Sequence, residues 1–281
     1  MINMNDNAHN HLPAIELKNV YKYYNDTAVL KDISFTVGRG ETKIILGGSG
    51  SGKSTILKLI IGLEQADQGE IWVEGKNITH FSESHLMKIR KRIGMVFQEG
   101  ALFDSLSVAD NVAFRLNEQG ELDDDKIMEV VKKTLGFVNL EEAINKMPAE
   151  LSGGMSRRAA IARALVGTPK IMLYDEPTAG LDPITARTIN ELVIKLRDLE
   201  GVSSIFVTHR LNDAYTLARE RLSFVQEEHV EDSRLTFQQD ISGSNRINTR
   251  FIMLRDGKII FEGSDESLRQ SRDQYIQRFL S

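Results

Sequence analysis

The sequence contains no cysteine, so disulfides and thiolate metal sites are excluded. Its wholly apolar runs, such as residues 171–174, are far shorter than the roughly 20 residues that a membrane-spanning helix needs. The net charge of −5 provides no basic surplus to recommend nucleic acid as the main partner. The polar start, MINMNDNAHNHL, lacks the apolar core of a signal peptide. If this protein serves a membrane, we therefore expect it to dock on something that spans it.

The residues that are present fit an ordinary globular protein. The chain has 281 residues, of which 41% are hydrophobic, enough for one large domain or two small ones. Residues 1–13 are predicted to form a loose tail, although His9 and His11 leave a metal-binding alternative open. No internal repeat is visible.

The hydrophobic pattern predicts two kinds of strand. Apolar and polar residues alternate at 14–20, 31–37 and 69–75, which indicates half-buried antiparallel strands. Continuous apolar runs at 167–176 and 202–209 indicate buried strands. Because these runs alternate with helical segments, they favour a parallel sheet.

Other segments predict helices and connections. Residues 41–62 read as a short buried strand, a Gly/Ser loop and a helix that ends at Gly62. Residues 98–167 are mostly helical in pattern. The helix predicted at 123–135 opens with three aspartates, which suit a helix N-terminus better than a metal site.

The last part of the chain predicts three different features. Residues 226–248 are polar and are predicted to be an irregular surface insertion. Residues 251–263 predict a hairpin that turns at Asp256-Gly257. Residues 265–280 predict a terminal helix.

The stretch GGSGSGKS, residues 47–54, matches the phosphate-binding pattern G-x-x-x-x-G-K-[ST]. Glycines allow successive backbone N–H groups to point into one concavity, and the helix that follows adds its positive end. Lys53 supplies a charge for the β and γ phosphates, and the Ser54 hydroxyl can ligate Mg²⁺. The candidate nucleotide-binding residues here are Gly47, Gly48, Ser49, Gly50, Ser51, Gly52, Lys53, Ser54 and Thr55.

Two carboxylates end the apolar run at 171–176. Asp175 and Glu176 stand where parallel sheets bind their ligands, at the carboxyl end of a buried strand. Asp175 is predicted to hold Mg²⁺, and Glu176 is predicted to be the general base for an attacking water. An acidic turn is the alternative for Asp-Glu-Pro taken alone, but the phosphate-binding loop favours the catalytic interpretation.

Two further polar residues follow apolar runs. His209 ends the run at 202–209 and is predicted to reach the same sheet edge as Asp175, where it can hydrogen-bond the γ phosphate and Glu176. Gln98 can touch Mg²⁺ or the attacking water. Taken alone, a histidine after an apolar strand is usually a core or turn residue, and Gln98 by itself carries almost no signal.

The stretch ELSGGMSRRAAIARAL, residues 150–165, has no nucleophile, acid–base pair or metal ligand. It places a serine and two glycines at a predicted helix start, followed by arginines and an alanine-rich face. Together with the other motifs in their order along the chain, this stretch resembles the signature of nucleotide-binding subunits of ABC transporters. The motifs are the P-loop (47–54), the glutamine loop (Gln98), the signature (151–155), the acidic strand end (171–176), the D-loop (179–182) and the switch histidine (His209).

The resemblance runs from about Ala14 to Ser281, except for 226–248. It implies the α/β P-loop NTPase fold of an ABC-type ATPase, with a mostly parallel core sheet, an N-terminal antiparallel β-subdomain and a helical signature subdomain. The implied domains are an ATP-binding core at 14–97 and 168–264, a helical subdomain at 98–167 and a C-terminal helix at 265–281.

The resemblance also implies a working dimer around ATP and Mg²⁺. Two copies pair head-to-tail, and Ser152, Gly153 and Gly154 of one copy cap the γ phosphate that Lys53 of the other holds. Glycines permit close backbone approach, and the helix N-terminus favours an anion.

Two further residues receive roles from the same resemblance. Asp182 is placed across the dimer seam, near the P-loop of the second copy. The family spacing favours Tyr24 as the ring that stacks on adenine, with Tyr23 as the alternative and a tyrosine that merely covers a strand edge as a third possibility.

Met155 stands where the commonest signature has glutamine. It occurs in ATPases that resemble the Mce/Mla lipid transporters, and the Gly-Ala-Leu-Phe at 100–103 fits the same branch. The implied partners are a membrane permease and an Mce-domain lipid-binding protein, with the chain on the cytoplasmic face of the inner membrane. A STAS-type partner, which accompanies a C-terminal extension in some members, stays open.

Alternatives remain at this point. An importer of a small polar solute would use the same ATPase, with Met155 as a drifted residue. A non-transport ABC protein fits less well, because those proteins separate their motifs by long coiled coils or carry two cassettes. The segment from Leu102 and Phe103 to Val108 is expected to be partly exposed, as a surface that grips the membrane subunit; the alternative is that Phe103 is core.

Overall fold

The computed structural model describes residues 12–225, 234–239 and 248–281. The predicted tail, with His9 and His11, lies almost wholly outside these residues. Within the described residues, no helix is both long and apolar enough to cross a membrane.

The chain forms two compact units. The first comprises Met1–His80 and Asn190–Ser281, and the second comprises Phe81–Ile189. The P-loop and His209 belong to the first unit, whereas the segment 98–167 lies inside the second.

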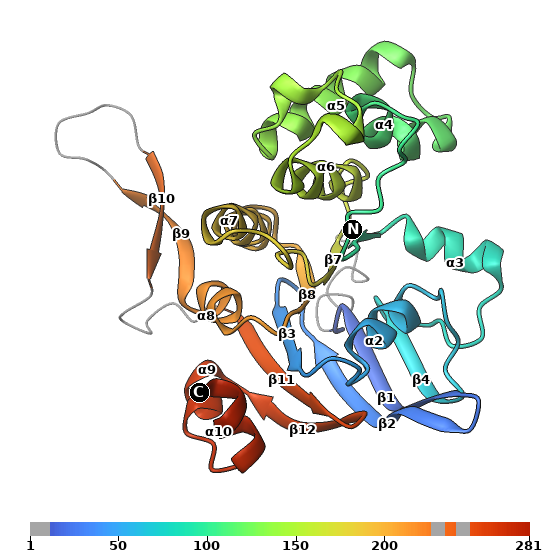
Figure 1. Ribbon diagram of the computed structural model, residues 1–281. Helices are drawn as coiled ribbons and strands as arrows, with labels where there is room; N and C mark the ends of the chain where they lie inside the picture. The colour runs from blue at the N-terminus through green and yellow to red at the C-terminus, as the bar shows by residue number, and fades with distance from the viewer. Residues whose placement is uncertain (1–11, 226–233, 240–247) are drawn as a thin grey trace, which may run out of the picture. The chain divides into compact units, whose positions relative to one another are not determined.

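A four-stranded antiparallel sheet opens the first unit (Figure 1). Its strands, in spatial order, are β2 (Thr27–Val37), β1 (Ile15–Tyr24), β4 (Gln68–Val73) and β5 (Lys76–Asn77). Along β1 buried residues such as Ile15 and Leu17 alternate with more exposed ones, as a sheet with one covered face requires. The predicted antiparallel strands are therefore confirmed.

The first unit also contains parallel strands. The strands β3 (Thr42–Gly47), β8 (Ser203–Val207) and β11 (Thr249–Arg255) run parallel, and β12 (Lys258–Gly263) returns antiparallel to β11. All six residues of β3 are buried, which explains its lack of alternation. The hairpin turn at Asp256 and Gly257 has φ of 50° and 76°, the positive values that a two-residue turn favours.

Two helices of the first unit follow strands. The helix α2 (Lys53–Ile60) ends as predicted before Gly62, whose φ of 70° is left-handed. The helix α8 (Leu211–Arg219) follows His209.

The predicted terminal helix at 265–280 is wrong as a single element. The structure has α9 (Asp265–Arg269) and α10 (Gln274–Leu280) instead. Asp273 accepts hydrogen bonds from the backbone N–H groups of Tyr275 (2.8 Å) and Ile276 (3.1 Å), and so begins a new helix.

The prediction of an irregular segment at 226–248 is wrong for residues 234–239. Strand β10 (Arg234–Gln239) pairs antiparallel with β9 (Glu220–Val225), so this part of the insertion is a strand whose backbone bonds are satisfied by its partner. Figure 1 shows β9 continuing directly from α8.

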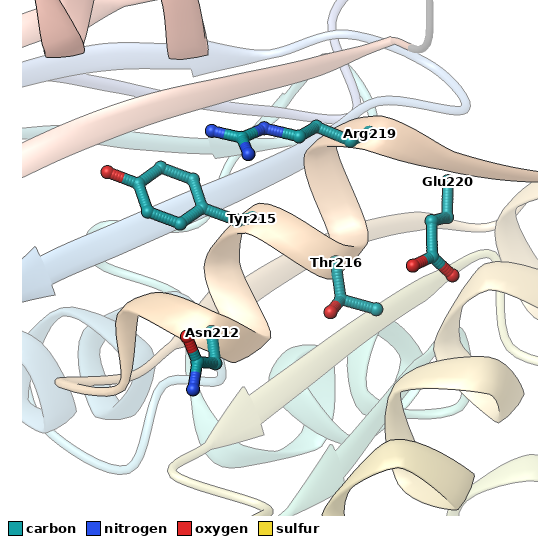
Figure 2. A pocket seen from close by; sticks show the side chains of 5 residues that line it. All are labelled: Asn212, Tyr215, Thr216, Arg219 and Glu220. Atoms are coloured by element: carbon teal, nitrogen blue, oxygen red, sulfur yellow. The ribbon is translucent and has the colours of Figure 1, made fainter. Parts of the chain in front are cut away.

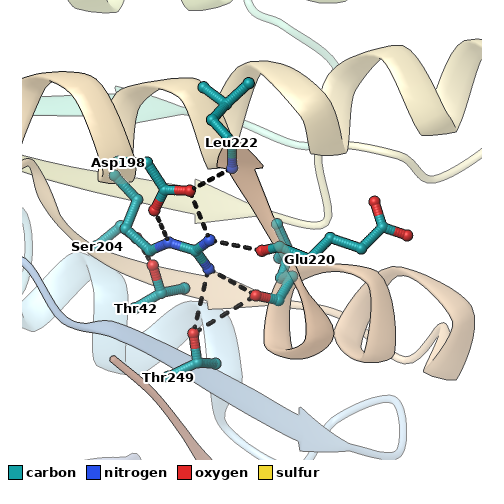
Figure 3. Close-up of polar contacts among 8 residues, drawn as sticks. Thr42, Asp198, Ser204, Glu220, Leu222 and Thr249 are labelled. Atoms are coloured by element: carbon teal, nitrogen blue, oxygen red, sulfur yellow. Dashed lines mark hydrogen bonds and ion pairs between the residues drawn. The ribbon is translucent and has the colours of Figure 1, made fainter. Parts of the chain in front are cut away.

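Arg197 fixes the start of β9. Its guanidinium donates to the carbonyl oxygens of Leu217 (2.6 Å) and Glu220 (2.7 Å) and to the Asp198 carboxylate (2.6 Å). Asp198 also accepts from the backbone N–H of Leu222 at 2.9 Å. Asp198, Glu220 and Leu222 lie around these contacts in Figure 3.

The second unit combines a pair of parallel strands with helices. The strands are β6 (Ile93–Val96) and β7 (Ile171–Asp175). The helices are α3 (Glu83–Arg90), α4 (Val108–Gln119), α5 (Asp124–Phe137), α6 (Gly153–Leu165) and the start of α7 (Pro183–Glu200), with short 3₁₀ turns at Glu141–Ala143 and Pro148–Glu150. Asp123 accepts from the backbone N–H of Lys126 at 3.0 Å, which confirms the predicted acidic helix start.

Candidate functional site

The P-loop is a backbone cradle built on glycine conformations. Gly50 and Gly52 have φ of 74° and 102°, which residues with a side chain adopt only under strain. Gly47 has no room for one, because a Cβ there would lie 2.6 Å from the carbonyl oxygen of Leu254. Lys53 is 6% exposed and donates to the carbonyl oxygens of Gly47 (2.9 Å) and Gly48 (3.0 Å), so its ammonium lies against the loop.

The start of α2 suits an anion. Its N-cap residue, Gly52, has no side chain to cap the helix, and the first turn contains no acidic residue. No acidic side chain of that turn therefore opposes the positive end of the helix dipole. The hydroxyl of Ser51 is buried and has no hydrogen-bond partner within the described residues. These features fit a phosphate group.

His209 reaches the same edge of the sheet as the P-loop. The P-loop follows β3 and His209 follows β8, and these neighbouring strands are parallel, with Ile45 paired to Val207. The backbone N–H of Thr208 continues the ladder, donating to the carbonyl oxygen of Ile45 at 3.2 Å. His209 itself is exposed.

Tyr24 interacts with the side chains of Glu64 and of Thr55, which lies on the P-loop helix α2. Burial, and after it the negative charge of Glu64, raises the pKa of Tyr24. The Lys22 ammonium lies 5.2 Å from the centre of the ring. The ring is 39% exposed, whereas Tyr23 lies on the same strand end without such a link.

A cavity beside the P-loop is lined in part by residues for which the sequence predicts no binding role. It has a volume of about 310 Å³ and is bounded by residues 48–51 together with Arg255, Asp256 and Tyr275. The Arg255 guanidinium lies 4.8 Å from the centre of the Tyr275 ring. The Asp256-Gly257 dipeptide predicts only a turn, and no sequence motif predicts a functional role for Tyr275.

In the second unit, Gln98 and the acidic pair follow neighbouring parallel strands. Val96 of β6 is paired with Tyr174 of β7, so the residues after both strands leave the same edge. Asp175 is buried, and Glu176 has a φ of 45°, a left-handed value that is uncommon outside glycine. The structure therefore brings the ends of these two strands together.

The signature motif begins α6 and packs against the D-loop. Ser152 is the N-cap residue and accepts from the backbone N–H of Met155 at 3.3 Å. A Cβ on Gly154 would lie 2.3 Å from the Thr185 methyl group, so only glycine fits there. Gly153 is exposed at the start of the helix.

Asp182 caps the start of α7. It accepts from the backbone N–H groups of Ile184 and Thr185, both at 3.0 Å, and from the Thr185 hydroxyl at 2.5 Å. The bonds from Thr185 hold the pKa of Asp182 below its ordinary value. Ile184 is 82% exposed, so the first turn of α7, next to the D-loop, presents a large apolar side chain to solvent.

The segment after Gln98 exposes aromatic surface. Phe103 is 42% exposed, and its ring centre lies 4.6 Å from that of Phe114, which is also exposed. Leu102 is half-buried. The expectation of partial exposure is wrong for Val108, which is fully buried because it begins α4.

A second hollow lies along α8, with a volume of about 250 Å³ (Figure 2). Asn212, Tyr215, Thr216, Arg219 and Glu220 line it. Arg219 is paired with the Asp265 carboxylate at 2.8 Å and stacks on Tyr215. No residue predicted from the sequence lies in this hollow.

The candidate Mg²⁺ ligands are oxygen donors from three separate segments. They are the Ser54 hydroxyl, the Gln98 amide and the Asp175 carboxylate, hard donors of the kind that Mg²⁺ takes alongside phosphates and water. Within the described residues no group of three or more His, Cys, Asp or Glu side chains is arranged to hold a metal. These donor types suit Mg²⁺ that is bound together with phosphate oxygens.

Comparison with known proteins agrees with these features. Residues 30–179 match the family model described as "ABC transporter". The chain is 36% identical to the intermembrane phospholipid transport system ATP-binding protein MlaF of Haemophilus influenzae, over 95% of this chain and 89% of that protein. It is also 36% identical to the chloroplastic protein TRIGALACTOSYLDIACYLGLYCEROL 3 of Arabidopsis thaliana, over 95% of this chain and 73% of that protein.

A solved structure supports the same assignment. A dimeric ATP-binding cassette in a post-hydrolysis state, bound to ADP and phosphate, has a TM-score of 0.74 and 31% sequence identity. The match covers 89% of this chain and 98% of the cassette. With a phosphate-binding loop, a capped signature helix and relatives that span most of its length, the chain belongs to the ABC transporter family of ATP-binding proteins.

Proposed function

We propose that this chain is the ATP-hydrolysing subunit of an ABC transporter that moves phospholipid through a permease of the Mce/Mla type. The observation that carries the ATPase part is the P-loop, where left-handed glycines, an uncapped helix start and the buried Lys53 form a cradle for phosphates. The lipid part is supported by 36% identity to MlaF over 95% of the chain.

In the proposed reaction, Lys53 and the P-loop N–H groups hold the β and γ phosphates. Glu176 takes a proton from a water molecule, whose oxygen bonds to the γ phosphorus as the bond to the β–γ bridging oxygen breaks. ADP and phosphate are the products. The left-handed backbone of Glu176 supports this role, because strained φ values concentrate at functional sites.

Five further residues would support the reaction. Ser54, Asp175 and Gln98 would hold Mg²⁺, which when bound neutralises charge on the phosphates. His209 would hydrogen-bond the γ phosphate and so respond to its presence. Tyr24, which interacts with Thr55 of the P-loop helix, would stack on adenine.

Two copies of the chain would close around two ATP. Ser152, Gly153 and Gly154 of one copy would meet the γ phosphate held by the other, and Asp182 would lie near the other copy's P-loop. The exposed N-terminus of α6 and the exposed Ile184 support this role, since both lack cover within the unit that contains them.

The membrane would be reached through the permease. Phe103 and Phe114 form an exposed aromatic pair of the kind that protein interfaces bury. The chain would then sit on the cytoplasmic face of the membrane, with an Mce-domain protein as a further partner.

The test is purification of the tagged chain from its native membrane in gentle detergent, followed by mass spectrometry of the proteins and lipids that accompany it. We expect a permease, an Mce-domain protein and phospholipid. The Phe103→Asp variant should lose the permease. Met128→Asp, which changes a residue of similar exposure on α5, should keep it.

Two results would contradict the proposal. A permease recovered with a solute-binding protein and no lipid would reject the lipid part and retain the ATPase. Equal recovery of the permease with Phe103→Asp and wild type would reject the aromatic pair as the docking surface.

A further inference from the structure

The glutamine loop, residues 97–101, is a tight turn that is closed by a backbone hydrogen bond. The backbone N–H of Gly100 donates to the carbonyl oxygen of Phe97 at 2.9 Å. Gly100 and Ala101 have successive left-handed φ values of 78° and 51°. Ala101 is under strain in this conformation, so contacts outside the turn must stabilise it.

Two arginines of the signature helix α6 supply such contacts. Arg157 donates to the carbonyl oxygen of Phe97 at 2.6 Å. Arg163 donates to the carbonyl oxygens of Gly100 (3.1 Å) and Ala101 (2.7 Å). The two side chains therefore hold the turn at both of its ends.

Arg157 is an unusual residue to bury. It is 7% exposed, and burial lowers its pKa, opposed by the nearby charge of Glu99. Its Nε has no hydrogen-bond partner within the described residues. A buried guanidinium is costly when its hydrogen bond goes to a neutral carbonyl, here that of Phe97, so a role beyond packing is indicated.

Arg163 extends the connection toward the aromatic pair. Its guanidinium lies 5.5 Å from the centre of the Phe103 ring. Asn111, fully buried on α4, accepts from the backbone N–H of Phe103 (2.8 Å) and donates to its carbonyl oxygen (3.0 Å). A continuous set of contacts thus joins Phe103, the glutamine loop and the helix that starts with the signature.

We propose that Arg157 and Arg163 clamp the glutamine loop to the signature helix, so that the two segments move together, and that Arg157 is the positioning residue for Gln98. This inference rests on the proposed role of Gln98 in the ATPase. It adds the residues that link the loop to the signature within one copy of the chain.

Arg158 is a matched control. It is the next residue on the same helix, and it also donates to backbone carbonyl oxygens, those of Val138 and Asn139 at the end of α5. Within the part of the chain that the structure describes, none of its hydrogen bonds reaches the glutamine loop. Removing it therefore removes an arginine without opening the clamp.

Two measurements on the full chain test the proposal. Hydrogen exchange of the amides at 97–103 should be about ten-fold faster in Arg157→Ala than in wild type, because the turn opens locally. The Mg²⁺ concentration for half-maximal ATP turnover should rise about ten-fold, as when a residue that orients a metal ligand is removed. Arg157→Lys keeps a donor and should recover part of both effects, whereas Arg158→Ala should change neither.

The outcomes separate this inference from the proposed function. Unchanged exchange at 97–103 in Arg157→Ala would overturn the clamp. Faster exchange with an unchanged Mg²⁺ requirement would overturn the positioning of Gln98. If wild type turned over no ATP, the proposed function would fail, while the exchange comparison would still decide whether the clamp exists.

Discussion

The P-loop and the glutamine loop are both short turns after buried strands, but they are held in different ways. The P-loop depends on glycine backbone conformations and on Lys53, which folds back onto carbonyl groups five and six residues away. The glutamine loop depends on arginines of a distant segment. Arg157, for example, follows Phe97 by 60 positions in the sequence. A loop stabilised by its own backbone can stay fixed, whereas a loop held by another helix moves when that helix moves.

The largest expected effect is on the rate of ATP hydrolysis and tests the general base. Glu176→Gln should lower kcat by about 10²- to 10⁴-fold, because it removes the general base. ATP binding should persist, since Lys53 and the P-loop are intact. Turnover by a coupled phosphate assay and binding by equilibrium titration check this. Undiminished turnover would reject Glu176 as the base.

A smaller effect tests the backbone character of the P-loop. Gly47→Ala should destabilise the chain by about 3 kcal/mol, because its Cβ would meet the carbonyl oxygen of Leu254. Gly50→Ala meets nothing within 4 Å and should cost about 1 kcal/mol, the strain of a left-handed residue. Urea unfolding without nucleotide measures both. Equal costs would show that space around Gly47 is not the constraint.

Adenine stacking should give a still smaller effect. Tyr24→Ala should weaken ATP binding by about 1–3 kcal/mol, the range for a base on an aromatic ring. Tyr23→Ala is the matched control, because the residue adjoins Tyr24 and has similar exposure. Titration with ATP measures both. A larger loss for Tyr23→Ala would transfer the stacking role to that residue.

The smallest effect concerns pH. The pKa of Asp182 is lower in the folded chain than in the unfolded chain, chiefly through its bonds from Thr185. Its stabilising effect is therefore present above the unfolded pKa and is lost as the pH falls through the folded pKa. The unfolding midpoint of wild type should fall slightly more than that of Asp182→Asn on acidification. Parallel curves for the two proteins would contradict this linkage.

The comparison also explains what the sequence could predict. Glycine spacing identifies the P-loop, because close approach and positive φ require glycine itself. Apolar runs ending in Asp175, Gln98 and His209 predict the strand ends, because parallel strands deliver such residues to an edge.

The rest could not be predicted because it depends on long side chains and distant partners. The sequence around Arg157 does not predict that its guanidinium donates to the carbonyl oxygen of Phe97. In sequence, Asn111 is an ordinary polar residue of a helix, and its bond to the carbonyl oxygen of Phe103 is not predicted either. The strand at 234–239 was missed because its alternation, with only Leu235 and Phe237 apolar, is short and lies inside a polar stretch, and its partner β9 supplies the pairing.

The central claim is that the P-loop of one copy and the signature of another close on the same ATP. Because the chain has no cysteine, a cross-linker that reacts with thiols can react only at cysteines introduced by mutation. Ser49→Cys and Ser152→Cys proteins, both also carrying Glu176→Gln, would be mixed with a short bis-maleimide cross-linker. We predict a cross-linked dimer in the mixture that depends on ATP. The claim would be contradicted if the same amount of cross-linked dimer formed with and without ATP, or if no cross-linked dimer formed.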